Sequence, residues 1–312
     1  MKSSPKPLIC LTTVFIPREH IFFLEEWIRH HLTIGVQHIF LYDNGTRSGE
    51  LRCLSTVYTP SPASVKLFNA GLTKRGEDYK LFTSRWTDDD ITRMTREIVN
   101  KFPGRVSLIP WRHLGKEGRV LYANILAYTH HLGTVQKGSW TIFTDLDEFI
   151  WTGVGYTLPD IIINMDRMGC VCIVLNHKRF WCRYTKNGPV SSVYDIKECV
   201  DMNTYPVFSG KSIVKTGYVR PINTHKFYVF GNKAVMKRDV MRFNHYTLIR
   251  GSATSWDGKK YKIDQNDGSL KETLTRTQEN TVNLKEVCED WQPQTLRESL
   301  KFYLKTVFRS PK

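Results

Sequence analysis

The sequence predicts an α/β fold in which a mostly parallel central sheet is flanked by helices. Over residues 8–150, short apolar runs rich in β-branched and aromatic residues alternate with segments of helical apolar spacing. Strand–helix–strand units cross over right-handedly into a parallel sheet. One further apolar run, at residues 140–144, leads directly into three acidic residues. Acidic side chains at the carboxyl end of a buried strand lie at the edge where open α/β sheets bind ligands.

The first strand–helix–strand unit is bounded by clear stop signals. We expect strands over residues 8–16 and 36–42, with a helix over residues 19–32 between them. Pro17 interrupts the first strand, and Gly35 suits the C-terminal cap of the helix. The Asp43-Asn44-Gly45 turn ends the second strand.

The same alternation continues to residue 145. We expect a helix over residues 89–101, a strand over residues 106–111, a helix over residues 120–131 and a strand that ends at Asp145. Thr87 is a good N-cap, and acidic residues in a first helical turn offset the helix dipole. We therefore interpret Asp88–Asp90 as a helix start and not as a site.

After residue 151 the pattern becomes less regular. We expect a short helix over residues 159–168, a strand over residues 170–175 and an antiparallel excursion with long loops over residues 176–245. A polar loop over residues 251–279 and a C-terminal helix from Leu284 follow. The predicted organisation is one domain over residues 1–250, with halves at 1–150 and 151–250, and an extension over residues 251–312.

Composition limits the class of protein. With 312 residues, 41% of them hydrophobic and 12% aromatic, the chain can build a large core. Its seven cysteines are odd in number and form no C-x-x-C pair, which disfavours a zinc module or a disulfide framework and favours reducing surroundings. No apolar run reaches the length of a membrane span, and no signal peptide is recognisable. We expect a cytoplasmic enzyme, or a piece trimmed of its anchor.

The net charge of +15 indicates an anionic partner: nucleic acid, a membrane surface or a polyanionic substrate. The basic residues are dispersed along the chain, apart from short groups at residues 237–238 and 259–262. A nucleoside diphosphate needs several basic residues but not fifteen. We therefore expect peripheral attraction to membranes or anionic glycans in addition.

The acidic residues after the strand at 140–144 are the strongest candidates for chemistry. Unpaired carboxylates beside an apolar core are costly, and a divalent cation would neutralise Asp145 and Asp147. Oxygen ligands suit Mg²⁺ or Mn²⁺. Asp147 is expected to bind the metal directly, and Asp145 to bind the metal or a ribose; Glu148 either supports the site or is structural. This pattern resembles the D-x-D site of metal-dependent, nucleotide-sugar-using glycosyltransferases.

Other candidate residues lie elsewhere in the sequence. His245, which follows a β-like run, is a candidate third metal ligand, although a lone histidine is commonly a surface or core residue. Lys211 and Arg250 are candidate donors to a diphosphate, with solvated surface positions as the alternative. Strand ends supply the candidate nucleotide contacts: Thr12, Thr13, Arg18, Asp43 and Asn44. Asp43 is equally well explained as part of a turn.

Three blocks of the chain resemble glycosyltransferase family 92 and its GT-A-fold relatives. They are the segment from Glu25-Glu26-Trp27 to Gly45, the segment from Trp140 to Phe149, and the separated pieces Lys211-Ser212, His225 and His245-Tyr246. The resemblance spans roughly residues 8–250. It implies a GT-A fold, a nucleotide-sugar donor, a divalent metal and inversion at the anomeric carbon. It also implies metal-site roles for Asp145, Asp147 and His245, and nucleotide binding for Asp43.

By this resemblance, residues 1–150 would bind the nucleotide sugar and residues 151–250 the acceptor. Two features depart from the family pattern. Pro17-Arg18-Glu19 stands where the family usually has Asn-Glu, and the upstream Gln of the helix before the D-x-D is absent. The i, i+4 pair Glu26 and His30 is interpreted as shaping the sheet-facing or exposed surface of its helix and not as a metal pair.

The predicted function is transfer of a hexose or pentose from a nucleotide-diphosphate sugar, with a UDP-sugar favoured, to a glycan or glycoprotein hydroxyl. An inverting displacement needs a carboxylate base, for which the candidates are Asp195, Glu198 and Asp201, with Asp257 behind them. Two other classes stay open. A glycoside hydrolase would use paired carboxylates without metal. A basic nucleic-acid- or anionic-glycan-binding protein would explain the charge but not the acidic motif.

Overall fold

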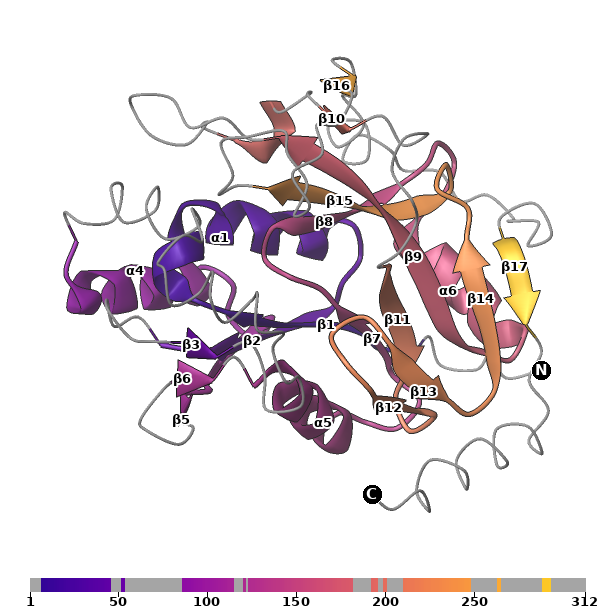
Figure 1. Cartoon of the computed structure of the whole chain (residues 1–312), viewed down its shortest axis with the longest axis horizontal. Helices are drawn as coiled ribbons and strands as arrows, with labels where there is room; N and C mark the ends of the chain where they lie inside the picture. Colours follow the sequence, from indigo (N-terminus) through magenta and orange to yellow (C-terminus); the bar gives the residue numbers. More distant parts are fainter. Residues whose placement is uncertain are drawn as a thin grey trace.

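The computed structural model describes residues 7–45, 52–53, 86–114, 120–121, 123–181, 192–195, 199–200, 210–247, 263–264 and 288–292. It confirms the predicted α/β class. Four parallel strands lie side by side in the order β4-β2-β1-β7, of which Figure 1 labels the last three. Their bounds are Ile9–Phe15 for β1, His38–Asp43 for β2, Val106–Pro110 for β4 and Trp140–Phe143 for β7.

The complete sheet is mixed, so the expectation of a mostly parallel sheet is wrong beyond β7. Strand β11 (Lys211–Lys215) runs antiparallel to both β7 and β9 (Cys170–Trp181). Strands β14 (Asn232–Met236) and β15 (Met241–Thr247) run parallel to β9, whereas β8 (Glu148–Thr152) pairs antiparallel with β15. Helices alternate with strands up to β7, but the strands from β11 to β15 follow one another without described helices between them, so parallel crossovers are not enforced.

Short strands complete the described sheets. They are β3 (Arg52–Cys53), β5 (His113–Leu114), β6 (Val120–Leu121), β10 (Cys199–Val200), β12 (Val219–Pro221), β13 (Phe227–Val229), β16 (Ile263–Asp264) and β17 (Cys288–Gln292). Strands β12 and β13 form an antiparallel pair, and β17 pairs with β14.

Helices cover both faces of the parallel strands. The helices are α1 (Pro17–Thr33), α4 (Asp88–Asn100), α5 (Asn124–Thr134) and α6 (Leu158–Arg167). Helix α1 lies on one side of β1 and β2, and α5 lies on the other (Figure 1). Trp27 and Ile28 of α1 belong to the larger hydrophobic core, while Tyr128 of α5 packs with Phe143 in a second core. None of the helices in these described ranges combines the length and apolar character that crossing a membrane requires.

The helix boundaries follow the predicted signals closely. Helix α1 has Pro17 in its first turn and is followed by Gly35, whose φ is +112°. Thr87 caps α4 through a capping box with Asp90, which confirms the interpretation of Asp88–Asp90 as a helix start.

Two predicted helices differ. Helix α5 begins at Asn124 and not at Val120, because residues 120–121 form β6 and Ala123 adopts a left-handed conformation with φ of 48°. Residues 288–292, expected in the C-terminal helix, form strand β17 along β14. The rest of that predicted helix, and the predicted polar loop apart from residues 263–264, lie outside the described residues.

Candidate functional site

The acidic motif follows β7, as the sequence predicted. All four residues of β7 are buried, and Leu146 is buried between the two aspartates. The side chains around Leu146 differ in exposure: that of Asp145 is 44% exposed and that of Glu148 only 1%. The three carboxylates therefore occupy three different environments.

Glu148 is a buried carboxylate held from several sides. The Thr144 hydroxyl and the Asp145 backbone N–H each donate to Glu148 Oε2 at 2.9 Å. Lys211 Nζ lies 3.7 Å from Oε2, and His177 Nε2 lies 3.1 Å from Oε1. Burial alone would raise the pKa of Glu148, but Lys211 and His177 outweigh burial and hold this pKa well below its ordinary value. Glu148 is therefore charged.

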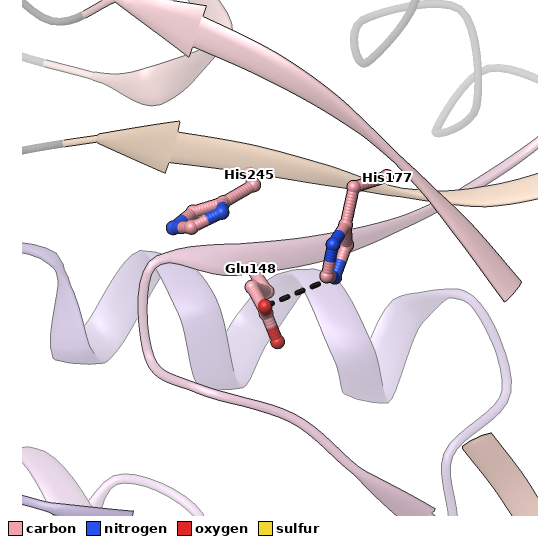
Figure 2. A group of neighbouring side chains, drawn as sticks. All are labelled: Glu148, His177 and His245. Atoms are coloured by element: carbon pink, nitrogen blue, oxygen red, sulfur yellow. Dashed lines mark ion pairs between the residues drawn. The ribbon is translucent and has the colours of Figure 1, made fainter. Parts of the chain in front are cut away.

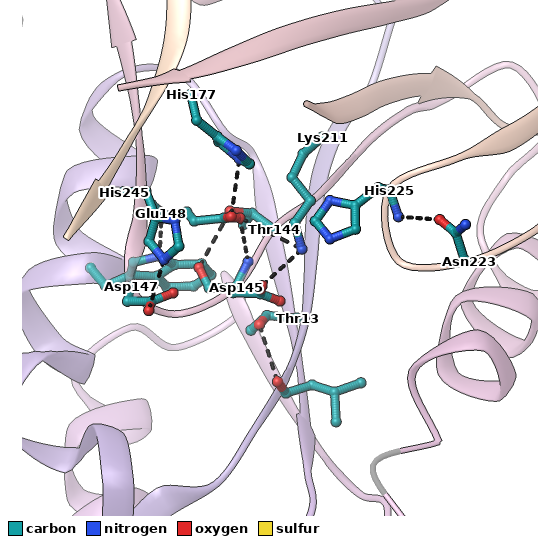
Figure 3. Close-up of polar contacts among 12 residues, drawn as sticks. Thr13, Thr144, Asp145, Asp147, Glu148, His177, Lys211, Asn223, His225 and His245 are labelled. Carbon is teal, nitrogen blue, oxygen red and sulfur yellow. Dashed lines mark hydrogen bonds and ion pairs between the residues drawn. The ribbon is translucent and has the colours of Figure 1, made fainter. Parts of the chain in front are cut away.

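Lys211, the first residue of β11, is fully buried, and its Nζ donates to Asp145 Oδ2 at 2.9 Å. Burial would lower the pKa of Lys211, but the carboxylates of Asp145 and Glu148 outweigh it and raise this pKa above its ordinary value. The predicted contact between Lys211 and a diphosphate therefore has a structural competitor, because the ammonium group already pairs with Asp145 inside the protein (Figure 3).

Asp147 and His245 are neighbours, although 98 residues separate them in the sequence. Strand β15 pairs with β8 so that His245 lies opposite Glu148, and the Tyr246 N–H donates to the Asp147 carbonyl at 2.7 Å. This register brings His245 Nε2 to 3.1 Å from Asp147 Oδ2. Burial would lower the pKa of His245, but the Asp147 carboxylate raises it above its ordinary value.

His177 is a site residue that the sequence analysis missed. It lies on β9, directly across from Phe243 of β15, and its ring points toward Glu148, with His245 nearby (Figure 2). One ligand atom from each of Glu148, His177 and His245 lies within 4.8 Å of the others. The available signal was a polar Asn176-His177 pair directly after an apolar run, the same pattern that marked Asp145.

His225 approaches the site from the turn between β12 and β13. Its backbone N–H donates to Asn223 Oδ1 at 2.8 Å, and its ring lies beside Lys211 (Figure 3). Burial, together with the positive charge of Lys211, lowers the pKa of His225 to about 4. The imidazole is therefore neutral at pH 7.

Of the residues expected to bind a nucleotide, Thr12 and Thr13 lie within β1 and not at its end, Asp43 ends β2, and Asn44 follows it. Thr12, Thr13 and Asn44 are buried, and the hydroxyl of Thr12 has no hydrogen-bond partner within the described part of the chain. Asp43 Oδ1 accepts from the Gly45 N–H at 2.8 Å, as in an ordinary turn. Arg18 is buried, pairs with Asp88 and donates to the Trp86 carbonyl at 3.0 Å, so that it ties α1 to the start of α4.

The remaining candidates stay predictions, because the structure does not describe their side chains. Asp195 lies in a short 3₁₀ turn, Val193–Asp195, of which only the backbone is described at that residue. Glu198, Asp201, Arg250 and Asp257 lie outside the described residues.

Glu26 and His30 are structural, as interpreted from the sequence. Glu26 accepts from the Ser192 hydroxyl and from the Val193 N–H, the latter at 3.1 Å. His30 is buried; its Nε2 donates to the Ile150 carbonyl at 2.8 Å, and its Nδ1 accepts from the Tyr194 hydroxyl at 3.0 Å. Both residues therefore fix α1 against its surroundings.

The donor chemistry of the site fits a divalent cation. The carboxylates of Asp147 and Glu148 face the imidazoles of His245 and His177 respectively, and each pair approaches to 3.1 Å. Buried ring nitrogens of His177 and His245 have no hydrogen-bond partner among the described residues. Imidazole nitrogen and carboxylate oxygen are common protein ligands of divalent first-row metals.

A mixed α/β sheet with helices on both faces, and with an acidic motif at the end of a central strand, is consistent with a GT-A-like glycosyltransferase architecture. The chain belongs to glycosyltransferase family 92, whose family model matches residues 87–300. Membership confirms the family resemblance and implies glycosyl transfer from a nucleotide-sugar donor to a glycan acceptor. A comparison with curated proteins gives no match.

Proposed function

We propose that this chain is a cation-dependent, inverting glycosyltransferase that moves a hexose or pentose from a UDP-sugar to a glycan or glycoprotein hydroxyl. The observation that supports cation dependence is the convergence of Asp147 and His245, whose Oδ2 and Nε2 atoms lie 3.1 Å apart beside the buried Glu148 carboxylate. The two-carboxylate mechanism of glycoside hydrolases does not employ a nitrogen–oxygen donor set of this kind.

We assign the cation, Mn²⁺ or Mg²⁺, to Asp145, Asp147 and His245. When bound, the cation neutralises charge on the departing diphosphate. Asp145 is the outermost of the three carboxylates, and Lys211 fixes its orientation through Oδ2. Asp147 and His245 hold each other in place across β8 and β15, so the site is ordered before a ligand arrives.

The nucleotide is proposed to bind Thr12 and Thr13 within β1, and Asp43 and Asn44 at the end of β2. Thr12 adjoins the acidic motif, since its carbonyl accepts from the Thr144 N–H at 3.3 Å. Arg250 is proposed to contact the diphosphate directly. Arg18 and Lys211 are buried and paired with Asp88 and Asp145, so we propose that they support the site without direct contact with the diphosphate.

Inversion requires a single displacement in which a carboxylate removes the proton of the acceptor hydroxyl. We propose that this base is one of Asp195, Glu198 and Asp201, because the segment follows β9, the strand that carries His177. Replacing each by its amide should abolish turnover only at the true base, while the affinity for the donor stays unchanged.

The test is a thermal-shift screen of the full chain with UDP, GDP, CMP and their sugars, with and without Mn²⁺ or Mg²⁺. A ligand that binds only the folded state raises the Tm. We expect a cation-dependent rise for UDP and UDP-sugars that Asp147→Asn removes. The control Asp89→Asn, at an exposed residue in the first turn of α4, should retain the rise. A screen without any nucleotide-dependent rise would contradict the proposal and favour a nucleic-acid- or anionic-glycan-binding protein.

A further inference from the structure

We propose that His177 and Glu148 are ligands of this cation, together with His245, so that two imidazoles contact the metal from inside the protein. This inference rests on the proposed cation dependence and extends its ligand set beyond the Asp-Leu-Asp motif. The two imidazoles would make the site selective for Mn²⁺, Co²⁺ or Zn²⁺ over Mg²⁺ and Ca²⁺.

The first argument is convergence from separate strands. Glu148 begins β8, His177 lies within β9 and His245 lies within β15, the strand that pairs with both β8 and β9. One ligand atom of each residue lies within 4.8 Å of the others (Figure 2). Because sheet pairing fixes all three backbones, the cluster is pre-organised and does not depend on a loop.

The second argument is the unmet bonding capacity of the rings. The His177 side chain is only 8% exposed, and its Nε2 lies 3.1 Å from Glu148 Oε1 without the geometry of a hydrogen bond. His245 Nδ1 is buried and likewise has no hydrogen-bond partner within the described ranges. Buried polar atoms normally have partners. A nitrogen and an oxygen about 3 Å apart match two neighbouring ligands that each lie about 2.1 Å from one metal.

The third argument is the distribution of charge around Glu148. Its Oε2 accepts from Thr144 and from the Asp145 N–H, and it faces Lys211 on the same side. Its Oε1 faces His177 instead. Lys211 therefore offsets the charge at Glu148 Oε2. A further cation would be held at Oε1, the oxygen that faces His177.

The metal preference follows from the donor atoms. Mg²⁺ favours oxygen ligands in nearly ideal octahedral geometry and keeps several waters, whereas imidazole nitrogen suits transition metals. Two imidazoles at one cation should therefore weaken Mg²⁺ binding relative to Mn²⁺ and Co²⁺. Asp147, which contacts His245 at 3.1 Å, completes the oxygen donors on the outer side.

A direct test counts nitrogen ligands by pulsed electron paramagnetic resonance of the wild-type full chain loaded with Mn²⁺. We expect hyperfine couplings from two imidazole nitrogens. Couplings from one imidazole, or from none, would overturn the proposal. Because this measurement needs no variant, it does not depend on whether a substituted chain folds.

A second test compares His177→Gln with His38→Gln by titration with Co²⁺. Glutamine at residue 177 keeps a polar side chain that can reach Glu148 but is a poor metal ligand. His38 bonds Ser107 at 2.9 Å on β2, so its replacement controls for loss of an imidazole elsewhere. We expect the Kd for Co²⁺ to rise by at least about tenfold in His177→Gln and to stay unchanged in His38→Gln. Equal affinity in both variants would reduce His177 to an ion-pair partner of Glu148.

The two proposals can fail separately. Two imidazole couplings without nucleotide-dependent stabilisation would support the ligand set and contradict the transferase. Nucleotide-dependent stabilisation with one imidazole coupling would support the transferase and contradict the role of His177.

Discussion

Lys211 Nζ lies 2.9 Å from Asp145 Oδ2, so the first aspartate of the Asp-Leu-Asp motif has an internal counter-ion. The ammonium group is fully buried and also faces Glu148 at 3.7 Å. The Lys211 ammonium group therefore offsets the charges of Asp145 and Glu148, whereas the Asp147 carboxylate pairs with His245 instead.

Removing this ammonium group should destabilise the fold strongly. In Lys211→Met, the buried Glu148 carboxylate loses its nearest full positive charge, and breaking a buried pair in this way costs about 3–5 kcal/mol. Asp145→Asn should cost about 1 kcal/mol or less, because the Asp145 side chain is 44% exposed and solvent screens its charge. Urea unfolding of the two variants measures both costs. Equal losses would show that Glu148 does not depend on Lys211.

The Trp27 indole controls the position of Glu148 through the backbone. Its Nε1 donates to the Glu148 carbonyl at 2.9 Å in the core. Trp27→Phe should lower the free energy of unfolding by about 1–3 kcal/mol because a buried carbonyl loses its donor. It should also weaken Mn²⁺ binding by displacing Glu148.

Trp140→Phe is the matched control for Trp27→Phe. The Trp140 Nε1 donates to Asp166 at 2.9 Å, away from the acidic motif. This variant should lose stability but keep the wild-type affinity for Mn²⁺, as measured by calorimetry. If both variants bind Mn²⁺ equally well, Trp27 acts on stability alone.

Several buried histidines, His30 and His131 among them, should make the fold sensitive to acid. Burial lowers the pKa of His30 to about 4 and that of His131 to about 3, whereas a solvated histidine has a pKa of 6.5. Because the unfolded chain then binds more protons, stability is complete above about pH 6.5 and falls as the pH drops toward these folded values. Each histidine contributes a slope of about 1.4 kcal/mol per pH unit in that range.

Urea unfolding between about pH 7 and pH 5 tests this slope. His131→Leu should reduce the slope by the contribution of one proton, while His30, His31 and His225, whose pKa values burial also lowers, should supply the rest of the histidine slope. A slope unchanged by His131→Leu would mean that His131 is protonated in the folded protein.

Gly35 should tolerate no side chain. A Cβ at this residue would lie 2.5 Å from Pro159 Cγ, and the φ of +112° disfavours any L-residue. Gly104→Ala is the control, since φ is +71° there and no described atom lies within 4 Å of its added Cβ. We expect a loss of about 1 kcal/mol for Gly104→Ala and about 2 kcal/mol more for Gly35→Ala, from overpacking against α6. Thermal unfolding of both variants gives the difference.

Local signals were sufficient to predict the first half of the fold. Apolar runs gave β1, β2 and β7, and Thr87 marked the start of α4 because capping depends only on neighbouring residues. The position of Asp145 at the end of β7 was predictable for the same reason.

Pairings between distant segments were not predictable from the sequence. His177 reaches Glu148 only because β9 runs parallel to β15, and Lys211 reaches Asp145 only because β11 inserts antiparallel beside β7. The apolar pattern of β11 is the same for either direction, so its residues carry no signal for a mixed sheet. The start of α5 was missed because the left-handed turn at Ala123 is set by its surroundings.

The matched family region begins at residue 87, yet β1 and α1 precede it. Strand β1 lies between β2 and β7, and α1 binds β8 through Trp27, His30 and His31. A fragment cut at the start of the match would lose β1, α1 and β2, and would leave one edge of β7, one edge of β4 and the apolar underside of Glu148–Thr152 uncovered. The start of the family match is therefore not the start of a unit that can fold alone. Expression trials should retain the first 45 residues.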